Sequence, residues 1–351
     1  MNSLLLNATD TLFFRDGRPF NMGEDTYAQG IFPPPPSVVY GALRTAYIAH
    51  HLEEGSLKEL INDSEKLRIQ SIFLSDGAGK IYVPAPRDLY VRKGADEGAF
   101  PVLKTKPLAS SLPTPKMLRY ATNEKPDVNT RLIALASLEQ YLKKERGIDA
   151  IATIPLNDFL EREVKIGIRR NNRTHTTDEG LLYRMEMLRP AKQQNGSSEI
   201  ATLQFLVNYS GITIPTETWL RMGGDRKPLY IDTFEKSKTI PCPTLRSTQF
   251  KIYLATPAVF EDGWHPQRLF SKYNLKLLAA ATGKPTPLGG FDMKAKRPKP
   301  MLRAVAAGAV YYVEANSLEE AQKTANAIHR HTVSDYNLAQ QGFGTAFVGN
   351  I

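Results

Sequence analysis

The stretch DTLFFRDGRPFNMGEDTYAQGIFPPPPSVVYGALR, residues 10–44, sets the organisation expected of the whole chain. The apolar run at 12–14 predicts the end of a buried strand, which the Gly- and Pro-containing turn after it stops. The four prolines at 33–36 form a stiff extended segment, because each ring fixes φ and removes a backbone donor. Ser37 suits an N-cap, so a helix is expected over residues 38–51.

One face of this helix carries Ser37, Gly41 and Arg44, at positions i, i+4 and i+7. A helix N-terminus offers free N–H groups and a positive dipole end, which favour anions. The glycine lets a backbone come close, and the arginine supplies a forked, permanently charged donor. The three residues are therefore a candidate phosphate site. An ordinary capped helix with a surface arginine explains them too, and the residues alone favour that simpler interpretation.

The composition favours an acidic partner. The chain has 351 residues, enough for two domains, with 42% hydrophobic residues and a net charge of +9. Such a charge favours nucleic acid without identifying it. The single Cys242 excludes an internal disulfide and a cysteine-based zinc site, which fits a reducing cytoplasm. Neither a signal peptide nor a membrane span is expected, since the longest apolar run, residues 304–313, is short.

The pattern of elements predicts an α+β protein built of two ferredoxin-like (RRM-like) domains in tandem. Residues 1–246 would form the first domain, with an insertion at about 88–150 that is irregular up to residue 127, and a projecting hairpin at about 164–188. Residues 247–351 would form the second. The individual elements expected are strands at 3–14 and 304–313, and helices at 130–144, 154–162 and 317–330, the last with a Ser317–Glu320 capping box.

Two basic loops carry candidate RNA-binding residues. The hairpin loop contains Arg169, Arg170 and Arg173, whose guanidinium groups can hold phosphates or read base edges. A second loop, residues 292–303, has five basic residues against one acid, and its prolines keep it extended. A solvated surface loop explains this second loop equally well. The candidates in and just before it are Gly289, Gly290, Lys294, Lys296 and Arg297.

The terminal string GFGTAFVGN places Gly342, Gly344 and Gly349 around a short predicted strand. Glycines allow positive φ and exposed N–H groups, which can hold a phosphate. The order helix, loop, strand is not the dinucleotide-binding fingerprint, and no Gly-Lys-Ser/Thr of a P-loop follows. From the residues alone, a helix C-cap and a tight turn is the favoured interpretation.

An ordered set of motifs resembles the RAMP superfamily of CRISPR proteins. The motifs are FFRDGRPF, FPPPPSVVYGALR, IYVPAPRDL, VKIGIRRNNRTHTTDEGLLYR, MGGDRK, PLGGF and GFGTAFVGN. The sequence is most similar to the subunit of type III-B (Cmr) effector complexes that holds the 5′ handle of the guide RNA (crRNA). This resemblance implies the tandem ferredoxin-like fold and a thumb-like hairpin. It also implies a terminal glycine loop close to guide RNA, which reverses the preference stated above.

The resemblance implies a non-catalytic, cytoplasmic subunit without cofactor or metal. It would grip the crRNA 5′ handle and contact the large polymerase-like subunit and the first backbone RAMP subunit. The polar loop at 21–30 and the Pro-rich insertion would make the protein contacts. The RNA face would combine the helix and loop residues already named with Gly223, Gly224 and Arg226 of the MGGDRK motif.

Two other function classes stay open. None of the six histidines stands in a metal-binding or hydrolase motif. His175 lies in the basic hairpin loop, so it is the one candidate acid or base for a metal-independent RAMP endoribonuclease that processes CRISPR RNA. The third class is a protein-only assembly subunit whose positive charge is incidental.

Overall fold

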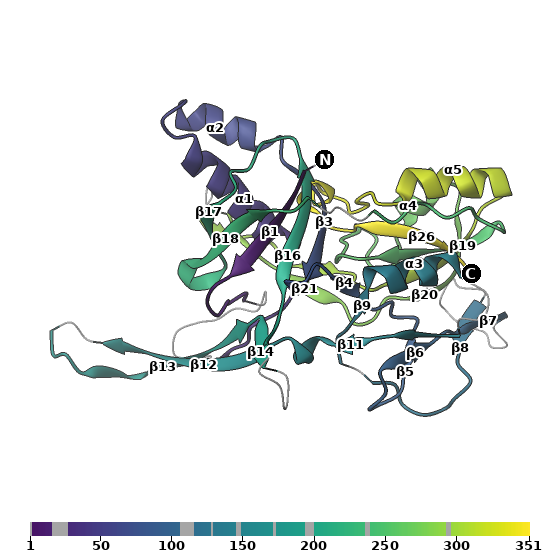
Figure 1. Cartoon of the computed structure of the whole chain (residues 1–351), viewed down its shortest axis with the longest axis horizontal. Coiled ribbons are helices and arrows are strands. Elements are labelled where there is room, and N and C mark those ends of the chain that lie inside the picture. Colours follow the sequence, from purple (N-terminus) through teal and green to yellow (C-terminus); the bar gives the residue numbers. More distant parts are fainter. Residues whose placement is uncertain are drawn as a thin grey trace.

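The computed structural model describes residues 2–15, 27–105, 116–127, 129–144, 149–170, 173–193, 200–235, 239–292 and 296–351. Within these ranges the fold is a mixed α+β arrangement in which strands outnumber helices (Figure 1). The expectation of an α+β protein is therefore confirmed.

A large antiparallel sheet, whose strands lie between residues 2 and 233, is the centre of the first half of the chain. Leu4 and Leu6 are buried on one of its faces, while Leu5 between them points to the other, as the two-residue period of a strand requires. In spatial order its strands are β11 (Ile154–Pro155), β9 (Arg131–Ala134), β4 (Ile81–Pro84), β3 (Arg68–Ser75), β16 (Gln204–Ser210), β1 (Asn2–Ala8), β18 (Lys227–Thr233) and β17 (Thr218–Met222).

Helix α1 (Pro36–His50) covers the Leu4 face of this sheet through Val39 and Leu43, which are fully buried. The helix confirms the prediction, but the predicted cap is wrong. Pro35 is the N-cap, Pro36 is the first helical residue, and the Ser37 side chain makes no capping hydrogen bond. Proline suits this position because the first helical N–H has no partner within the helix. Helix α2 (Leu57–Ser64) follows and packs on α1, with a capping box between Ser56 and Glu59.

The first strand is shorter than predicted. It ends at Ala8, and the predicted continuation to residue 14 is wrong. The Thr11 N–H donates to the Asp10 carboxylate over 2.6 Å, which turns the chain away from the sheet. Leu12 then makes a single bridge to Leu188, and Phe14 is buried without belonging to a strand. The apolar run was therefore a signal of burial and not of strand.

The predicted helices at 130–144 and 154–162 are corrected by the structure. Residues 131–134 are strand β9, and helix α3 (Leu135–Lys143) begins only afterwards. β9 pairs with β4, so the sheet overrides the helical pattern. The second segment contains β11, a single 3-10 turn (Leu156–Asp158) and the start of the hairpin, and its apolar residues Leu156 and Phe159 fill the core under α1.

The expected hairpin is confirmed and is longer than expected. Strands β12 (Glu161–Arg170) and β13 (Thr177–Arg189) pair antiparallel and project from the body of the molecule (Figure 1). The insertion before it, expected to be irregular up to residue 127, contains short strands instead. The remaining strands of this half are β2 (Tyr27–Ala28), β5 (Tyr90–Val91), β6 (Glu97–Ala99), β7 (Val102–Thr105), β8 (Lys116–Arg119), β10 (Ala150–Ala152), β14 (Ala191–Gln193) and β15 (Ile200–Thr202).

The second half contains an antiparallel sheet ordered β20-β25-β19-β26. Its four strands and two α-helices follow one another as β-α-β-β-α-β, as expected, with the four short strands β21–β24 inserted between β20 and β25. The Ser317 hydroxyl accepts the Glu320 N–H, as the cap of the predicted helix requires. The predicted strand at 304–313 is interrupted by a turn at Gly308, where φ is 85°. The elements are β19 (Gln249–Leu254), α4 (Gln267–Lys272), β20 (Lys276–Ala281), β21 (Thr286–Leu288), β22 (Phe291–Asp292), β23 (Arg297–Pro298), β24 (Leu302–Ala304), β25 (Val310–Glu314), α5 (Leu318–Ile328) and β26 (Ala346–Asn350).

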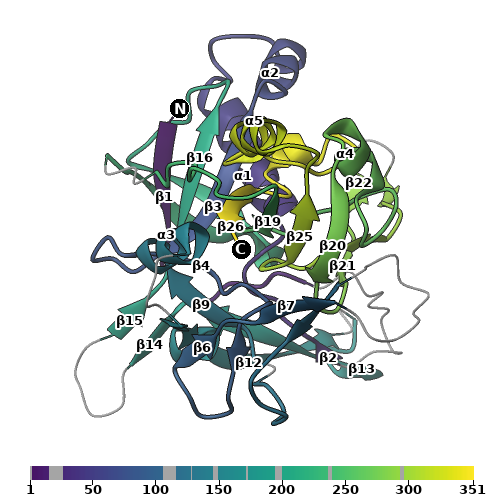
Figure 2. The same cartoon turned by 90° about the vertical axis from the view of Figure 1, so that its right-hand side faces the viewer.

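The two halves share a hydrophobic core, which we call the seam. Phe73 and Leu206 of the large sheet pack here with Tyr253 and Phe347 of the small sheet and with helix α3. Figure 2 shows β1, β16 and β3 of the large sheet beside β26, β19 and β25 of the small one. Helices α4 and α5 cover the opposite face of the small sheet. The face of the small sheet that α4 and α5 do not cover is therefore buried in the seam.

The segment at 84–88, within the IYVPAPRDL motif, fastens the seam. The Tyr253 hydroxyl donates to the Pro84 carbonyl over 2.6 Å, and the Arg87 N–H donates to the Gly308 carbonyl over 2.8 Å. Asp88 is fully buried, and its Oδ2 accepts hydrogen bonds from Tyr141 of α3 (2.7 Å) and Tyr312 of β25 (2.6 Å). One carboxylate thus joins elements from both halves.

Replacing Asp88 with alanine is expected to destabilise the protein by about 2–4 kcal/mol, because two buried hydroxyls lose their acceptor. Asp88→Asn keeps one acceptor oxygen and is expected to cost less. Chemical denaturation of both variants measures the difference. Equal stability of Asp88→Ala and the unaltered protein would show that the carboxylate does not hold the seam.

Lys251 is buried in the same core, 2% exposed, with its Nζ 3.3 Å from the centre of the Tyr141 ring. Burial lowers the pKa of this lysine to about 7, against its ordinary 10.5, while the Asp88 carboxylate opposes part of the shift. Between these two values the unfolded chain binds more protons than the folded one, so the free energy of unfolding rises with pH across this range.

Lys251→Met is expected to remove this rise and to stabilise the protein by roughly 1–4 kcal/mol at neutral pH, since no ammonium group has to be desolvated. Urea titrations of both proteins between neutral and alkaline pH provide the measurement. The same pH slope in both would contradict the assignment of the rise to Lys251.

Candidate nucleic-acid interface

The terminal segment is fixed against α1 by one side chain. Gln340 lies in a 3-10 turn (Ala339–Gln341), and its Nε2 is within hydrogen-bond distance of the Tyr40 hydroxyl (2.8 Å). The same nitrogen lies 2.6 Å from the Glu65 carbonyl and 3.0 Å from the Leu67 carbonyl. The structure therefore brings the predicted helix α1 and the predicted glycine segment together, although 300 residues separate Tyr40 from Gln340.

Arg44 is held at this junction by helix α2. Its Nε donates to the Ser64 hydroxyl over 2.9 Å, and its Nη2 lies 3.8 Å from the Glu65 carboxylate. The guanidinium carbon lies 5.7 Å from the centre of the Tyr40 ring. On the same helix Gly41 is exposed, and a Cβ added there would meet nothing within 4 Å. The stripe thus offers an oriented, partly exposed cation beside open space.

A cavity of about 320 Å³ opens between β3 and residues 330–340. Arg68 is anchored by hydrogen bonds from its Nη1 to the Glu65 and Leu67 carbonyls (2.8 and 2.9 Å). Glu65 also contacts Arg44, through its carboxylate. One wall belongs to the first half of the chain and the other to the second. We call this cavity the seam groove; its polar and charged lining residues are Arg68, Gln70, Arg330, His331, Thr332 and Gln340.

Gln70 lies in the floor of the groove at a β-bulge. Asn208 pairs with Ser71 and Tyr209 with Ile69, so Gln70 is the extra residue. Its Nε2 donates to the Ser210 hydroxyl over 2.6 Å, whereas its Oε1 is buried and accepts no hydrogen bond within the described residues. Buried acceptors are normally paired.

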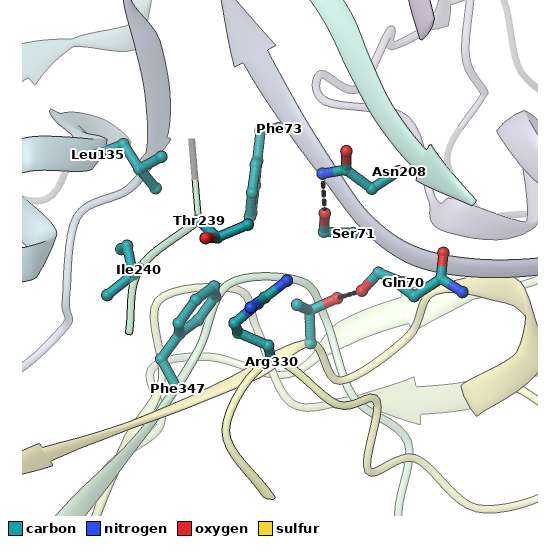
Figure 3. A pocket seen from close by; sticks show the side chains of 10 residues that line it. Gln70, Ser71, Phe73, Leu135, Asn208, Thr239, Ile240, Arg330 and Phe347 are labelled. Atoms are coloured by element: carbon teal, nitrogen blue, oxygen red, sulfur yellow. Dashed lines mark hydrogen bonds between the residues drawn. The ribbon is translucent and has the colours of Figure 1, made fainter. Parts of the chain in front are cut away.

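A second, smaller pocket adjoins the seam groove. Figure 3 shows Gln70 and Arg330 at this pocket, together with Ser71 and Asn208, which are joined by a hydrogen bond of 2.7 Å. The Thr345 hydroxyl donates to the Gln70 carbonyl over 2.8 Å. The strand that leaves the terminal glycine segment is therefore tied directly to the bulge.

The three terminal glycines each have a packing reason in the structure. A Cβ on Gly342, where φ is 94°, would lie 2.7 Å from Cγ2 of Ile69, and one on Gly344 would lie 3.0 Å from the Ser334 nitrogen. Gly349 faces α3, where an added Cβ would lie 2.8 Å from the Leu142 Cα. All three glycines are buried. Their predicted contact with RNA stays a prediction.

Gly342→Ala is expected to destabilise the protein by about 1–3 kcal/mol, through left-handed backbone strain and collision with Ile69. The matched control is Gly41→Ala, in a helix with open space, which is expected to stabilise by about 0.5–1 kcal/mol. Thermal unfolding of both variants compares them. Similar effects of the two changes would contradict the packing role of Gly342.

The Gly223–Arg226 turn lies at the base of the hairpin. The Gly224 N–H donates to the Phe13 carbonyl over 2.8 Å, and a Cβ on Gly223 would lie 2.6 Å from that oxygen. Asp225 pairs with Lys165 of β12, and Arg226 is exposed. The predicted FFRD and MGGDRK motifs are therefore in contact.

The predicted hairpin arginines lie at its far end. Arg169 and Arg170 end strand β12, and Arg173 is exposed in the turn that follows. His175 is exposed in the same turn, with φ of 57°. Among the residues described, no group of three or more His, Cys, Asp and Glu side chains is placed to hold a metal ion.

The basic loop at 289–303 is an arm rooted beside the terminal segment. Strands β21 and β24 pair antiparallel, and Leu288 of β21 and Ala304 of β24 share a small core with Phe343. Gly289 and Gly290 link β21 to β22, and the Gly290 carbonyl accepts the Lys299 N–H over 2.9 Å. Lys296 and Arg297 are exposed, and Lys294 lies outside the described residues. Helix α1, through Tyr40, and the root of this arm thus both contact residues 338–343.

Sequence reasoning missed the seam groove. Arg68 begins a strand and Arg330 follows a helix, so each has an ordinary place in its local pattern. One signal was available, since Gln70 and Ser71 interrupt the apolar residues of β3. No helix of the described ranges is long and apolar enough to cross a membrane.

Comparisons with known proteins identify the family. Residues 4–351 match the family described as CRISPR-associated protein (Cas_Cmr3). The fold is similar to that of a chain in the cryo-EM structure of the Type III-B Cmr-beta bound to cognate target RNA and AMPPnP. The TM-score is 0.52 at 16% identity, over 88% of this chain and 86% of that chain. The same complex bound to cognate target RNA gives a TM-score of 0.51 with the same identity and coverage. No curated protein matches the sequence.

Proposed function

The chain belongs to the Cas_Cmr3 family of CRISPR-associated proteins and is a component of CRISPR effector complexes, and we propose that it is the guide-RNA-binding subunit of such a complex. In this proposal it holds the crRNA 5′ handle of a type III-B complex used in antiviral defence. The observation that carries the proposal is the seam groove, where Arg68, Gln70 and Arg330, from both halves of the chain, line one cavity.

The chemistry of this groove supports a nucleic acid ligand. Arginine side chains bind phosphates as fixed, planar donors, and phosphate contacts position a strand without reading its sequence. Arg44 on α1 lies close to this groove, because Glu65 contacts Arg44 through its carboxylate and Arg68 through its carbonyl. A polyanion also agrees with the net charge of +9.

We propose protein contacts with the large polymerase-like subunit and with a backbone RAMP subunit. The hairpin supports such a neighbour. Val164, Ile166 and Ile168 alternate along one face of β12 and are 58, 60 and 52% exposed, and Leu182 opposite Ile168 is 43% exposed. A row of exposed aliphatic side chains on a projecting hairpin is typical of an interaction surface.

The proposal extends to the fold and to catalysis. The central strands β3-β16-β1-β18 have the same chain order, second-third-first-fourth, as β20-β25-β19-β26. This supports two ferredoxin-like domains, 1–246 and 247–351, although β17 replaces the second helix in the first. We propose a non-catalytic role, since His175 is exposed on a turn and has no described partner.

The test is to co-express the chain with the other subunits, purify the complex and sequence the 5′ ends of the bound RNA. A repeat-derived 5′ handle is expected. Combined Arg44→Ala and Arg68→Ala is expected to lower guide retention about five- to twenty-fold and to reduce its salt dependence, because phosphate contacts are lost.

The matched control is Arg268→Ala on α4, an exposed arginine that pairs with Glu261 away from the groove. It is expected to leave guide retention unchanged. Full guide retention in the double variant would refute the role of the groove. Cutting of repeat RNA by the chain alone, abolished by His175→Ala, would establish the endoribonuclease instead.

A further inference from the structure

The arm at 289–303, of which residues 289–292 and 296–303 are described, exposes a large aromatic side chain. Phe291 is 55% exposed, and Met301 is 50% exposed nearby in sequence. Phe291 pairs with Pro298 across β22 and β23, and the arm is anchored through Leu288 and Ala304 in the core beside Phe343. The Phe291 ring has no aromatic or cationic partner within the described residues. Folding of the chain therefore leaves this ring in water.

The surroundings of the ring carry unbalanced positive charge. Lys296, Arg297, Lys299 and Arg303 are all exposed. No ion pair joins them to a side chain that the structure describes, and the side chain of Asp292, opposite Arg297 in the β22–β23 pair, is not among these. Residues 286–303 contain a single acid, Asp292. Elsewhere on this chain exposed cations do have carboxylate partners, as Arg92 has Glu124 and Lys66 has Asp63. The arm is thus complementary to a polyanion.

We propose that Phe291 is a base-stacking residue for single-stranded RNA, whose phosphates the arm's Lys296, Arg297 and Lys299 contact. Proteins that bind single strands combine cationic tracks with exposed aromatic rings, because every base has a face on which a ring can stack. The inference rests on the proposed function and adds a second contact point to it. RNA in the seam groove and RNA on the arm lie on either side of residues 338–343.

The root of the arm lies close to the seam groove. This root shares a core with Phe343, whose neighbour Gly342 packs on β3 next to the groove. The root of the arm and the groove are therefore linked through Gly342 and Phe343, so one RNA strand can contact both. Stacking on Phe291 would hold the path of the RNA strand without reading its sequence, since the phenylalanine side chain has no hydrogen-bonding group.

The test is fluorescence anisotropy with the full chain and a labelled single-stranded RNA of mixed sequence, compared with an abasic ribose-phosphate oligomer of the same length. Phe291→Ala is expected to weaken RNA binding about five- to twenty-fold, while Phe291→Tyr restores it. Binding of the abasic oligomer and the salt slope are expected to stay unchanged. Lys296→Ala is expected to lower the salt slope by about one and to weaken both ligands.

The matched control is Trp219→Ala, because Trp219 is 56% exposed on β17 and lies outside the arm. Equal affinity of Phe291→Ala and the unaltered chain for RNA would overturn the inference, and so would an equal loss for the abasic oligomer. Displacement of RNA from Lys296 and Arg297 by polyglutamate, with no effect of Phe291→Ala, would identify the arm as an acidic-protein site and also overturn it. If one of these results is obtained while the purified complex with the unaltered chain still contains guide RNA, the inference about Phe291 fails and the proposed function stands.

Discussion

The Asp88 carboxylate is the contact on which the arrangement of the two halves depends. It is fully buried, and it accepts hydroxyl hydrogen bonds from Tyr141 and Tyr312, which lie on elements of different halves. Buried polar groups of this kind specify one docking geometry, because any other leaves them unpaired. The seam groove has one wall from each half, so its width follows from this docking. A local polar contact thus sets the geometry of a distant binding surface.

The same docking decides where nucleic acid can bind. In a ferredoxin-like domain the helix-free face of the sheet is available for bases to stack on. Here Tyr253, Tyr312 and Phe347 occupy that face of the second sheet, and all three are buried in the seam. In our proposal RNA therefore binds outside that face, at the loops where residues 330–343 and the basic arm lie.

Local patterns in the sequence predicted the elements whose stability is local. Helix α5 has its own cap and apolar period, and the β12–β13 hairpin has its own alternation, so both were recognised. Strand β9 was missed because its pairing with β4 comes from the sheet and not from its residues. The terminal glycines were expected to form a helix C-cap and a tight turn, and Gly342 is the left-handed cap of a 3-10 turn, but its packing against Ile69 was not foreseen. The groove was missed because Arg68 and Arg330 are far apart in the chain.

We propose above all that guide RNA lies along the seam groove, between the two halves of the chain. Ultraviolet crosslinking of the assembled complex, followed by mass spectrometry of RNA-linked peptides, tests it directly. We expect crosslinks in peptides that contain Arg44, Arg68 and residues 330–343, all from the handle end of the guide. Guide RNA crosslinked to other subunits but never to these peptides would contradict the account, and would show that the positive surface of the seam serves another purpose.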